Sequence, residues 1–314
     1  TVNVITLNAN QTINGTLTTN SGSTNAARRS VFVSGTYGTA TTLTAAAVSL
    51  TDADFRDITG AGAATWSGTR LGDAGGNSGI TFRAATTFYW NAATGNFGTN
   101  SWATSSGGAV SSVNFPLPQD TAVFTNANPA AAGTVTLNAA YNLPALDFSG
   151  RTNTMTFATG TITPYAYGSI TLSSSITLSG TGTITFAHRS GTATITSAGV
   201  TWTQPLTISS IGATVNLGSA FSSSNPLSLL YGTFNANTYN VTPLTFSSTG
   251  TSVRTLNLSS STWTIPGPPA GAWTLSGTNL TLNAGTSTIS MTSASARTFA
   301  GGGYTYYNLN QGGA

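Results

Sequence analysis

The chain has 314 residues and a formal net charge of +3, and only 5% of its residues are charged, against roughly 25% in an average soluble domain. It contains no Lys, no Glu and no Cys, so all nine basic residues are Arg and all six acidic residues are Asp. These features exclude a disulfide framework or thiolate metal site, the dense basic stripe of a nucleic-acid-binding protein and an apolar run long enough to span a bilayer.

Residues 1–87 are predicted to form short strands separated by clusters of turn residues. Apolar residues alternate with Thr, Ser or Asn in these strands, which is the period of a half-buried β-strand. Strands are predicted at 2–7, 12–17, 30–33, 47–51, 54–59 and 80–82. This segment is expected to form the N-terminal coils of a parallel β-helix.

The densest group of charges in the chain is Asp52, Asp54 and Asp57 around Arg56. A pair of Asp side chains could serve glycoside hydrolysis, and Asp52 and Asp54 on one face of a strand could hold Ca²⁺ with backbone carbonyls. The alternative is that these residues cap a coil or pair with Arg56 at the surface. The sequence favours this last, purely structural role.

A second segment is predicted to begin at residue 88 and to extend to 314 and beyond. It opens with an aromatic cluster, Tyr89, Trp90, Phe97 and Trp102. If exposed, these rings could stack on a glycan; if buried, they form a plug at the start of a coil, because each ring buries a large apolar area. The plug is the favoured interpretation.

Strands with strict alternation of apolar residues and Thr or Ser dominate the segment from 133 to 291. They are predicted at 134–137, 155–157, 169–172, 175–178, 183–186, 193–196, 200–202, 207–208, 214–217, 255–258, 262–265, 280–282 and 288–291. Short strands at this spacing fit a solenoid, a barrel or a sandwich. A solenoid stacks like residues over like residues about 4.8 Å apart, where identical charges would repel. The loss of charge therefore favours an all-β parallel β-solenoid of the right-handed β-helix type, with coils of roughly 20 residues, over an array of β-sandwiches.

His188 is the only histidine. A Ser-His-Asp triad would need Ser and Asp side chains beside it, whereas the glycines around it indicate a turn. The sequence therefore predicts no catalytic residue, no metal site and no cofactor.

The run from Tyr89 to Trp102 has the form Tyr-Trp-x-x-x-Thr-Gly-Asn-aromatic-x-x-x-x-Trp. It is followed by Gly107-Gly108 and by Asp120-Thr121-Ala122-Val123-Phe124. In these motifs, and in a Gly-Gly-Gly-Tyr segment at 301–304, the region 88–311 resembles repeat segments of large bacteriophage tail-fibre-like virion proteins. It is also similar to repeats of secreted bacterial adhesins and autotransporter passengers. Phe97 stands where Trp is commoner, and Ser101 where Asn or His often precedes the final Trp.

The resemblance implies a non-enzymatic virion protein, forming a stiff β rod in a tail fibre, spike or other appendage that displays or contacts a host-surface element. Expected partners are further copies of the chain, as a homotrimer or other homo-oligomer, other virion or surface proteins and a host cell-surface glycan. The alternatives are an extracellular adhesin or filament subunit of a bacterial cell surface and, from a different class, a polysaccharide-degrading β-helix enzyme.

Overall fold

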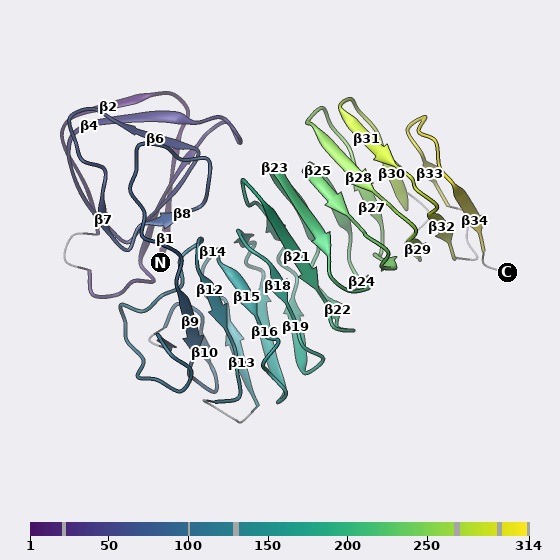
Figure 1. Ribbon diagram of the computed structural model, residues 1–314, viewed down its shortest axis with the longest axis horizontal. Coiled ribbons are helices and arrows are strands. Elements are labelled where there is room, and N and C mark those ends of the chain that lie inside the picture. Colours follow the sequence, from purple (N-terminus) through teal and green to yellow (C-terminus); the bar gives the residue numbers. More distant parts are fainter. Residues whose placement is uncertain (21–22, 100, 128–131, 267–270, 294–296, 313–314) are drawn as a thin grey trace. The chain divides into compact units, whose positions relative to one another are not determined.

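The computed structural model describes residues 1–20, 23–99, 101–127, 132–266, 271–293 and 297–312. Over these residues the chain consists of β-strands and the loops between them (Figure 1). The strands stack in parallel as a β-solenoid of about 12 turns within the described ranges. The predicted fold class is confirmed, and the sandwich alternative is not what the chain adopts.

The chain divides into two compact units. The first comprises Thr1–Asn153 with Tyr165–Gly168, and the second comprises Thr154–Pro164 with Ser169–Ala314. The domain boundary that the sequence suggests, between residues 87 and 88, stays a prediction.

The first unit begins with two stacks of strands that share a core. One stack has the order β1 (Val2–Leu7), β3 (Arg29–Ser34), β5 (Ala53–Arg56) and β8 (Gly72–Asp73). The other contains β2 (Gln11–Thr19), β4 (Thr41–Thr51), β6 (Ile58–Ala61) and β7 (Gly68–Thr69). Phe32, Phe55 and Leu43 pack between them, and the rings of Phe32 and Phe55 stack at 5.2 Å.

The expected strand at 80–82 does not form. Ile80 and Phe82 instead lie in an extended segment without strand pairing, and both pack against the core of β1–β8. The two apolar residues pack against the core without belonging to a strand. An alternating sequence pattern does not distinguish such a segment from a β-strand.

The remainder of the first unit is a further set of coils. Its strands are β9 (Thr87–Trp90), β10 (Gly95–Asn96), β11 (Trp102–Ala103), β12 (Thr121–Val123), β13 (Gly133–Thr136), β14 (Asn142–Leu143), β15 (Ala145–Asp147) and β17 (Tyr165–Ala166). Among the strand pairs described, β11 departs from the parallel rule: it runs antiparallel to β9, with Trp102 opposite Trp90. The other side of β9 pairs in parallel with β12.

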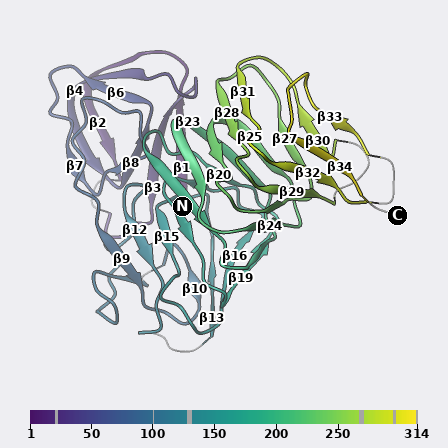
Figure 2. The ribbon, with the colours of Figure 1, turned by 45° about the vertical axis from the view of Figure 1, so that its right-hand side comes forward.

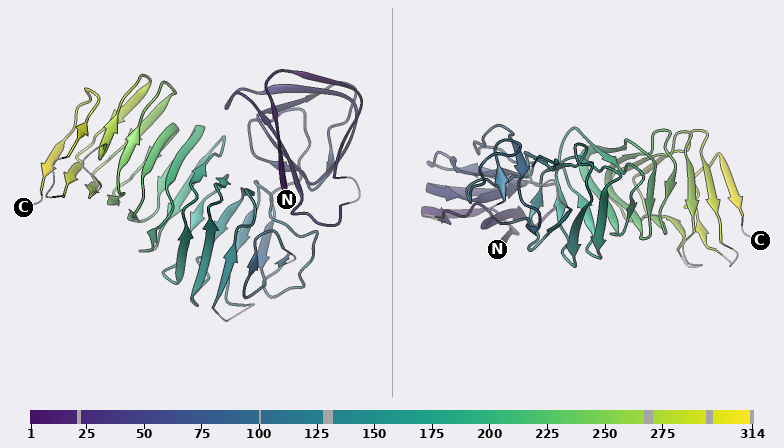
Figure 3. Two further views of the ribbon diagram at one scale, coloured as in Figure 1. Left: turned by 180° about the vertical axis from the view of Figure 1, so that it is seen from behind. Right: turned by 90° about the horizontal axis from the view of Figure 1, so that it is seen from below.

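The second unit holds the longest regular stack. Its strands are β16 (Met155–Gly160), β18 (Ile170–Thr171), β19 (Ile176–Gly180), β20 (Ile184–Phe186), β21 (Thr192–Thr196), β22 (Thr201–Trp202), β23 (Leu206–Leu217), β24 (Phe221–Ser223), β25 (Leu227–Asn235), β26 (Val241–Thr242), β27 (Phe246–Ser248), β28 (Arg254–Asn257), β29 (Thr262–Ile265), β30 (Trp273–Leu275), β31 (Leu280–Asn283), β32 (Thr288–Met291), β33 (Phe299–Ala300) and β34 (Asn308–Gln311). Figures 2 and 3 show these strands from other directions, lying beside one another in successive coils.

Equivalent positions in successive coils of the second unit are paired in register. Leu206 pairs with Leu227, Leu227 with Phe246, and Phe246 with Trp273. One coil therefore takes between 19 and 27 residues, close to the expected length of roughly 20. In strands such as β29, buried and partly exposed residues alternate: the apolar side chains point inward and the Thr side chains point outward.

Polar residues form ladders on the outside of this stack. Asn216, Asn235, Asn257 and Asn283 follow one another in register, and the Asn283 amide donates to Asn257 Oδ1 at 2.7 Å. A parallel ladder of threonines runs two positions before it, through Thr214, Thr233, Thr255 and Thr281. The ladders that the composition predicts are confirmed, and they need no ionic group.

Long strands bend at glycines where one face of the coil meets the next. Gly212 in β23 and Gly232 in β25 have positive φ angles of 72° and 78°. The register between these two strands shifts at this bend. A Cβ at Gly232 would collide with the Ser210 carbonyl oxygen of the coil beneath, so only glycine fits this corner.

Candidate functional site

The acidic cluster that the sequence singles out occupies the corners of one coil. Asp52 lies between β4 and β5, Asp54 lies in β5, and Asp57 lies between β5 and β6. Asp52 and Asp57 have positive φ angles of 53° and 57°, a conformation that Asp tolerates better than most residues. All three side chains are buried, with relative exposures of 0% to 2%, so the expected surface position is wrong.

Asp52 is held by two arginines from neighbouring coils. Arg70 donates through Nε to Oδ1 at 2.6 Å and through Nη2 to Oδ2 at 3.0 Å. Arg29 Nη1 lies 3.5 Å from Oδ1 of the same carboxylate. Arg29 is only 1% exposed, so both Arg29 and Asp52 are removed from water, whereas the Arg70 side chain is 19% exposed.

Arg29 also joins Asp52 to Asp54. Its Nε is 3.2 Å from Asp54 Oδ1, and its Nη2 donates to the same oxygen. The other oxygen of Asp54 accepts from the Asn142 amide at 3.1 Å. Asp57 accepts from the Gly38 backbone amide at 3.0 Å. Each carboxylate is therefore engaged by groups of the chain itself.

Arg29 and Arg70 were not assigned as partners of Asp52 by the sequence analysis. They lie 23 and 18 residues from it, which is about one coil in each direction. The expected coil length of roughly 20 residues could have identified these arginines, because residues one coil apart lie over one another.

The cluster does not have the geometry of a metal or hydrolytic site. Within the described part of the chain, no group of three or more His or acidic side chains is placed to hold a metal ion. A glycosidase needs two carboxylates that reach a bound sugar, whereas Asp52 and Asp54 share Arg29 inside the protein.

Three of the four aromatic residues at the start of the predicted segment 88–314, which lie in the first unit, are buried. Trp90, Phe97 and Trp102 are 0% to 1% exposed, and the Trp102 ring lies 5.2 Å from that of Trp90 and 5.0 Å from that of Phe97. The indole N–H of Trp102 donates to the Phe97 carbonyl at 2.8 Å. These rings offer no surface for a glycan and pack as the plug around which the β9–β11 hairpin closes. Tyr89 alone is partly exposed.

His188 lies in the connection between β20 and β21, and its ring is buried. Its Nε2 is 3.0 Å from the Thr214 carbonyl oxygen, and its Nδ1 is 2.9 Å from the Ser210 hydroxyl. A carbonyl oxygen only accepts, so the proton of the neutral ring is on Nε2 and the Ser210 hydroxyl donates to Nδ1. Ser210 is 0% exposed. Both ring nitrogens are engaged, one by a backbone carbonyl and one by this buried hydroxyl, so no carboxylate orients the ring as in a triad and the pair links neighbouring coils.

This buried histidine predicts a pH-dependent stability. Burial lowers the pKa of His188 below its ordinary value of 6.5, so the unfolded chain binds a proton at a higher pH than the folded chain does. The free energy of unfolding should therefore decrease as the pH falls below about 6.5, by at most about 1.4 kcal/mol per pH unit for one proton. Guanidinium denaturation at several pH values between about 6.5 and 5 measures this slope.

The matched variant is His188→Gln, because no other side chain of the sequence ordinarily titrates in this range. The variant should lose the slope. An unchanged slope would show that His188 is not its source.

Arg56 reaches the acidic cluster only through Asp57 and makes its other contacts with tyrosines. Its guanidinium lies between two aromatic rings, 4.8 Å from the centre of Tyr37 and 5.1 Å from that of Tyr165. Nη1 donates to the Tyr167 hydroxyl at 3.4 Å. Burial raises the pKa of Tyr167 above its ordinary value, so this hydroxyl is neutral. The nearest ion-pair contact is Asp57 Oδ2, 4.0 Å from Nε.

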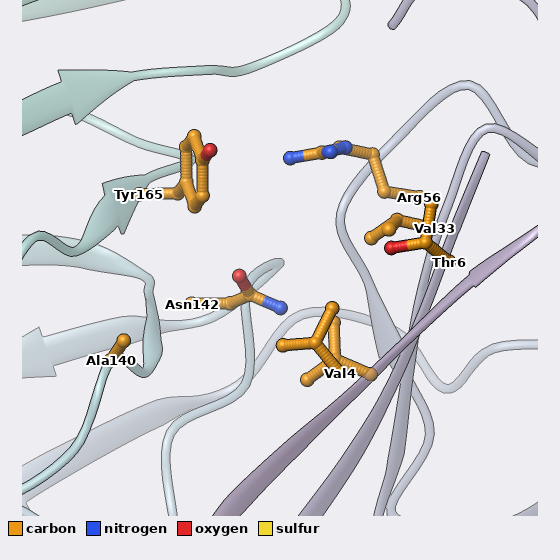
Figure 4. A pocket seen from close by; sticks show the side chains of 8 residues that line it. Val4, Thr6, Val33, Arg56, Ala140, Asn142 and Tyr165 are labelled. Carbon is orange, nitrogen blue, oxygen red and sulfur yellow. The ribbon is translucent and has the colours of Figure 1, made fainter. Parts of the chain in front are cut away.

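A cavity of about 230 Å³ borders Arg56, within the first unit (Figure 4). One wall is the outer face of β1, β3 and β5, and the opposite wall includes Asn142 and Tyr165. Figure 4 shows the Arg56 guanidinium and the Tyr165 ring turned toward each other beside this space, in the 5.1 Å contact described above. Of the groups described above, this cavity alone combines an accessible volume with a buried cation.

No helix among the described residues is long and apolar enough to cross a membrane. No protein-family model, no curated protein and no solved structure matches the chain.

Proposed function

We propose that the chain is a non-enzymatic structural segment of a bacteriophage tail fibre, spike or other virion appendage, in which the stacked coils act as a stiff spacer that displays or contacts a host-surface element. The observation that supports this most is the continuous like-over-like register of the second unit, in which Asn, Thr and apolar positions repeat coil after coil. Such a stack saturates its backbone hydrogen bonds between coils and depends only on nearest neighbours, which suits a mechanical element.

The charge distribution supports the same proposal. The second unit contains no acidic residue, and the buried Arg254 is bonded to backbone instead: its Nη2 donates to the carbonyls of Gly250 and Thr278 at 3.1 and 3.0 Å. An arginine bound to turn carbonyls ties one corner of a coil to the next without an ion pair.

The test is the location of the protein in its native setting. Antibodies raised against the purified full chain should label an appendage of purified virions in immunogold electron microscopy. Mass spectrometry of the same virions should find peptides of the chain. Label confined to a bacterial surface, with no peptide in virions, would overturn the proposal in favour of a secreted adhesin or extracellular filament subunit.

A further inference from the structure

The cavity beside Arg56 is lined on one side by an outward face of the first coils. Val4 pairs with Val31 in register, and Val33 pairs with both Thr6 and Arg56. Because strand residues alternate between faces, these side chains point away from the core that contains Phe32 and Phe55. The result is an apolar wall with a cation at its end.

Arg56 is paired more loosely than three other arginines of the first unit. Arg29, Arg70 and Arg83 each donate a hydrogen bond to an Asp carboxylate. Arg56 is 8% exposed, its ion-pair contact with Asp57 is 4.0 Å long, and among the described residues its side chain donates only from Nη1, to Tyr167. Its Nε is sealed inside the protein, so the donor that a carboxylate from a ligand could engage is Nη2; a buried cation whose donors are not fully used is costly.

The opposite wall provides groups suited to a sugar ring. Tyr165 is 41% exposed and lines the cavity, and in Figure 4 its ring is turned toward the Arg56 guanidinium, which lies 5.1 Å from the ring centre. Asn142 donates its amide nitrogen to Asp54, which leaves its side-chain carbonyl oxygen to accept from a ligand hydroxyl. Thr6 adds a hydroxyl at the rim. Aromatic and apolar walls with a few polar groups are the usual lining of a small-molecule site.

We propose that this cavity binds one sugar residue that carries a carboxylate, of the uronic acid type. The carboxylate accepts from Nη2 of Arg56, the apolar face of the ring lies against the valine wall beside Tyr165, and a ring hydroxyl donates to Asn142. The volume of 230 Å³ is below the roughly 300–1,000 Å³ of sites for drug-sized ligands, so the site takes a single ring. The binding of the sugar rests on the cavity alone; that the sugar belongs to a host-surface glycan rests on the proposed function.

The test is calorimetric titration of the purified full chain with methyl β-D-glucuronide. Methyl β-D-glucoside serves as the neutral control and acetate as the bare carboxylate. The glucuronide should bind at least about tenfold more tightly than either, because a hydrogen bond to a charged group accounts for about that factor. Equal affinity for the glucoside, equal affinity for acetate, or no binding of the glucuronide would each overturn the proposal.

Two variants locate the site. Arg56→Gln should weaken glucuronide binding at least about tenfold, whereas Arg28→Gln, an equal change of charge at an exposed position, should leave it unchanged. Val4→Trp fills the cavity from a position that is 61% exposed and keeps Arg56, so it decides the question if Arg56→Gln does not fold. Full binding by a folded Val4→Trp variant would place the sugar elsewhere. Virion labelling is independent of this titration, so either proposal can fail without the other.

Discussion

Replacing Trp263 by alanine is expected to lower the free energy of unfolding by about 3–5 kcal/mol, the range of large-to-small substitutions at buried aromatic residues. Trp263 is 0% exposed, and its ring lies 5.4 Å from that of Trp273 and 5.0 Å from that of Phe246. It pairs in register with Val241 on one side and Ile289 on the other. The cavity therefore opens between coils whose positions are fixed by backbone ladders and cannot collapse freely.

The measurement is the guanidinium midpoint of the full chain, followed by far-ultraviolet circular dichroism. Val253→Ala is the control, because Val253 is 76% exposed and an exposed substitution should change the stability by less than about 0.5 kcal/mol. Equal midpoints for the two variants would contradict a core in which each coil depends on its neighbours. Hydrogen exchange should place the loss of protection in the coils next to β29, because a solenoid transmits stability only between adjacent repeats.

The substitution Asp52→Asn is expected to cost about 3–5 kcal/mol, as does the removal of one partner from a buried ion pair. Asp52 is 0% exposed and receives Arg70 through two hydrogen bonds, with Arg29 beside it. Without the negative charge, Arg29 retains its ion pair with Asp54. Arg70 loses its carboxylate partner, and one of its two donors then faces the NH2 group of the substituted side chain, which cannot accept a hydrogen bond. The penalty comes mainly from Arg70, whose side chain is only 19% exposed and is left without a carboxylate.

Asp147→Asn provides the comparison. Asp147 is only half-buried and accepts from the Ser149 backbone amide at 2.8 Å, so its loss of charge should be nearly neutral. Denaturation of both variants at the same pH measures the difference. If Asp52→Asn were as mild as Asp147→Asn, the ion network at Asp52 would be exposed to solvent in solution, and its role in holding the first coils together would have to be abandoned.

The regular strands of the chain could be predicted because their signal is local. In the second unit, Thr262, Trp263, Thr264 and Ile265 alternate between the outside and the core as the sequence indicates. The region from 221 to 248 carries β24, β25, β26 and β27 and was not predicted. Pro226 and Gly232 interrupt the local sequence pattern there. β25 nevertheless runs through Gly232 from Leu227 to Asn235, because β23 and β28 of the coils on both sides supply its hydrogen-bonding partners.

The candidate site could be predicted only in part. The aromatic plug was found because rings at this density indicate burial. The acidic cluster is buried, so its expected position at the surface is wrong. The expected pairing with Arg56 holds only for Asp57, at 4.0 Å, whereas Asp52 and Asp54 pair with arginines about one coil away. Arg56 also contacts Tyr167, which is 111 residues away.

By itself the sequence determined that the chain is all-β, that its coils stack like residues over like residues, and that ionic groups are dispensable on its surface. These properties follow from composition and from a period of two residues, both of which are read within a few positions. The tertiary structure decided which coil pairs with which, which arginines neutralise Asp52, and that Arg56 lies between two tyrosine rings beside a cavity. Those contacts join residues separated by one coil or more, and their partners are fixed by the closure of each turn and by register, which no local pattern encodes.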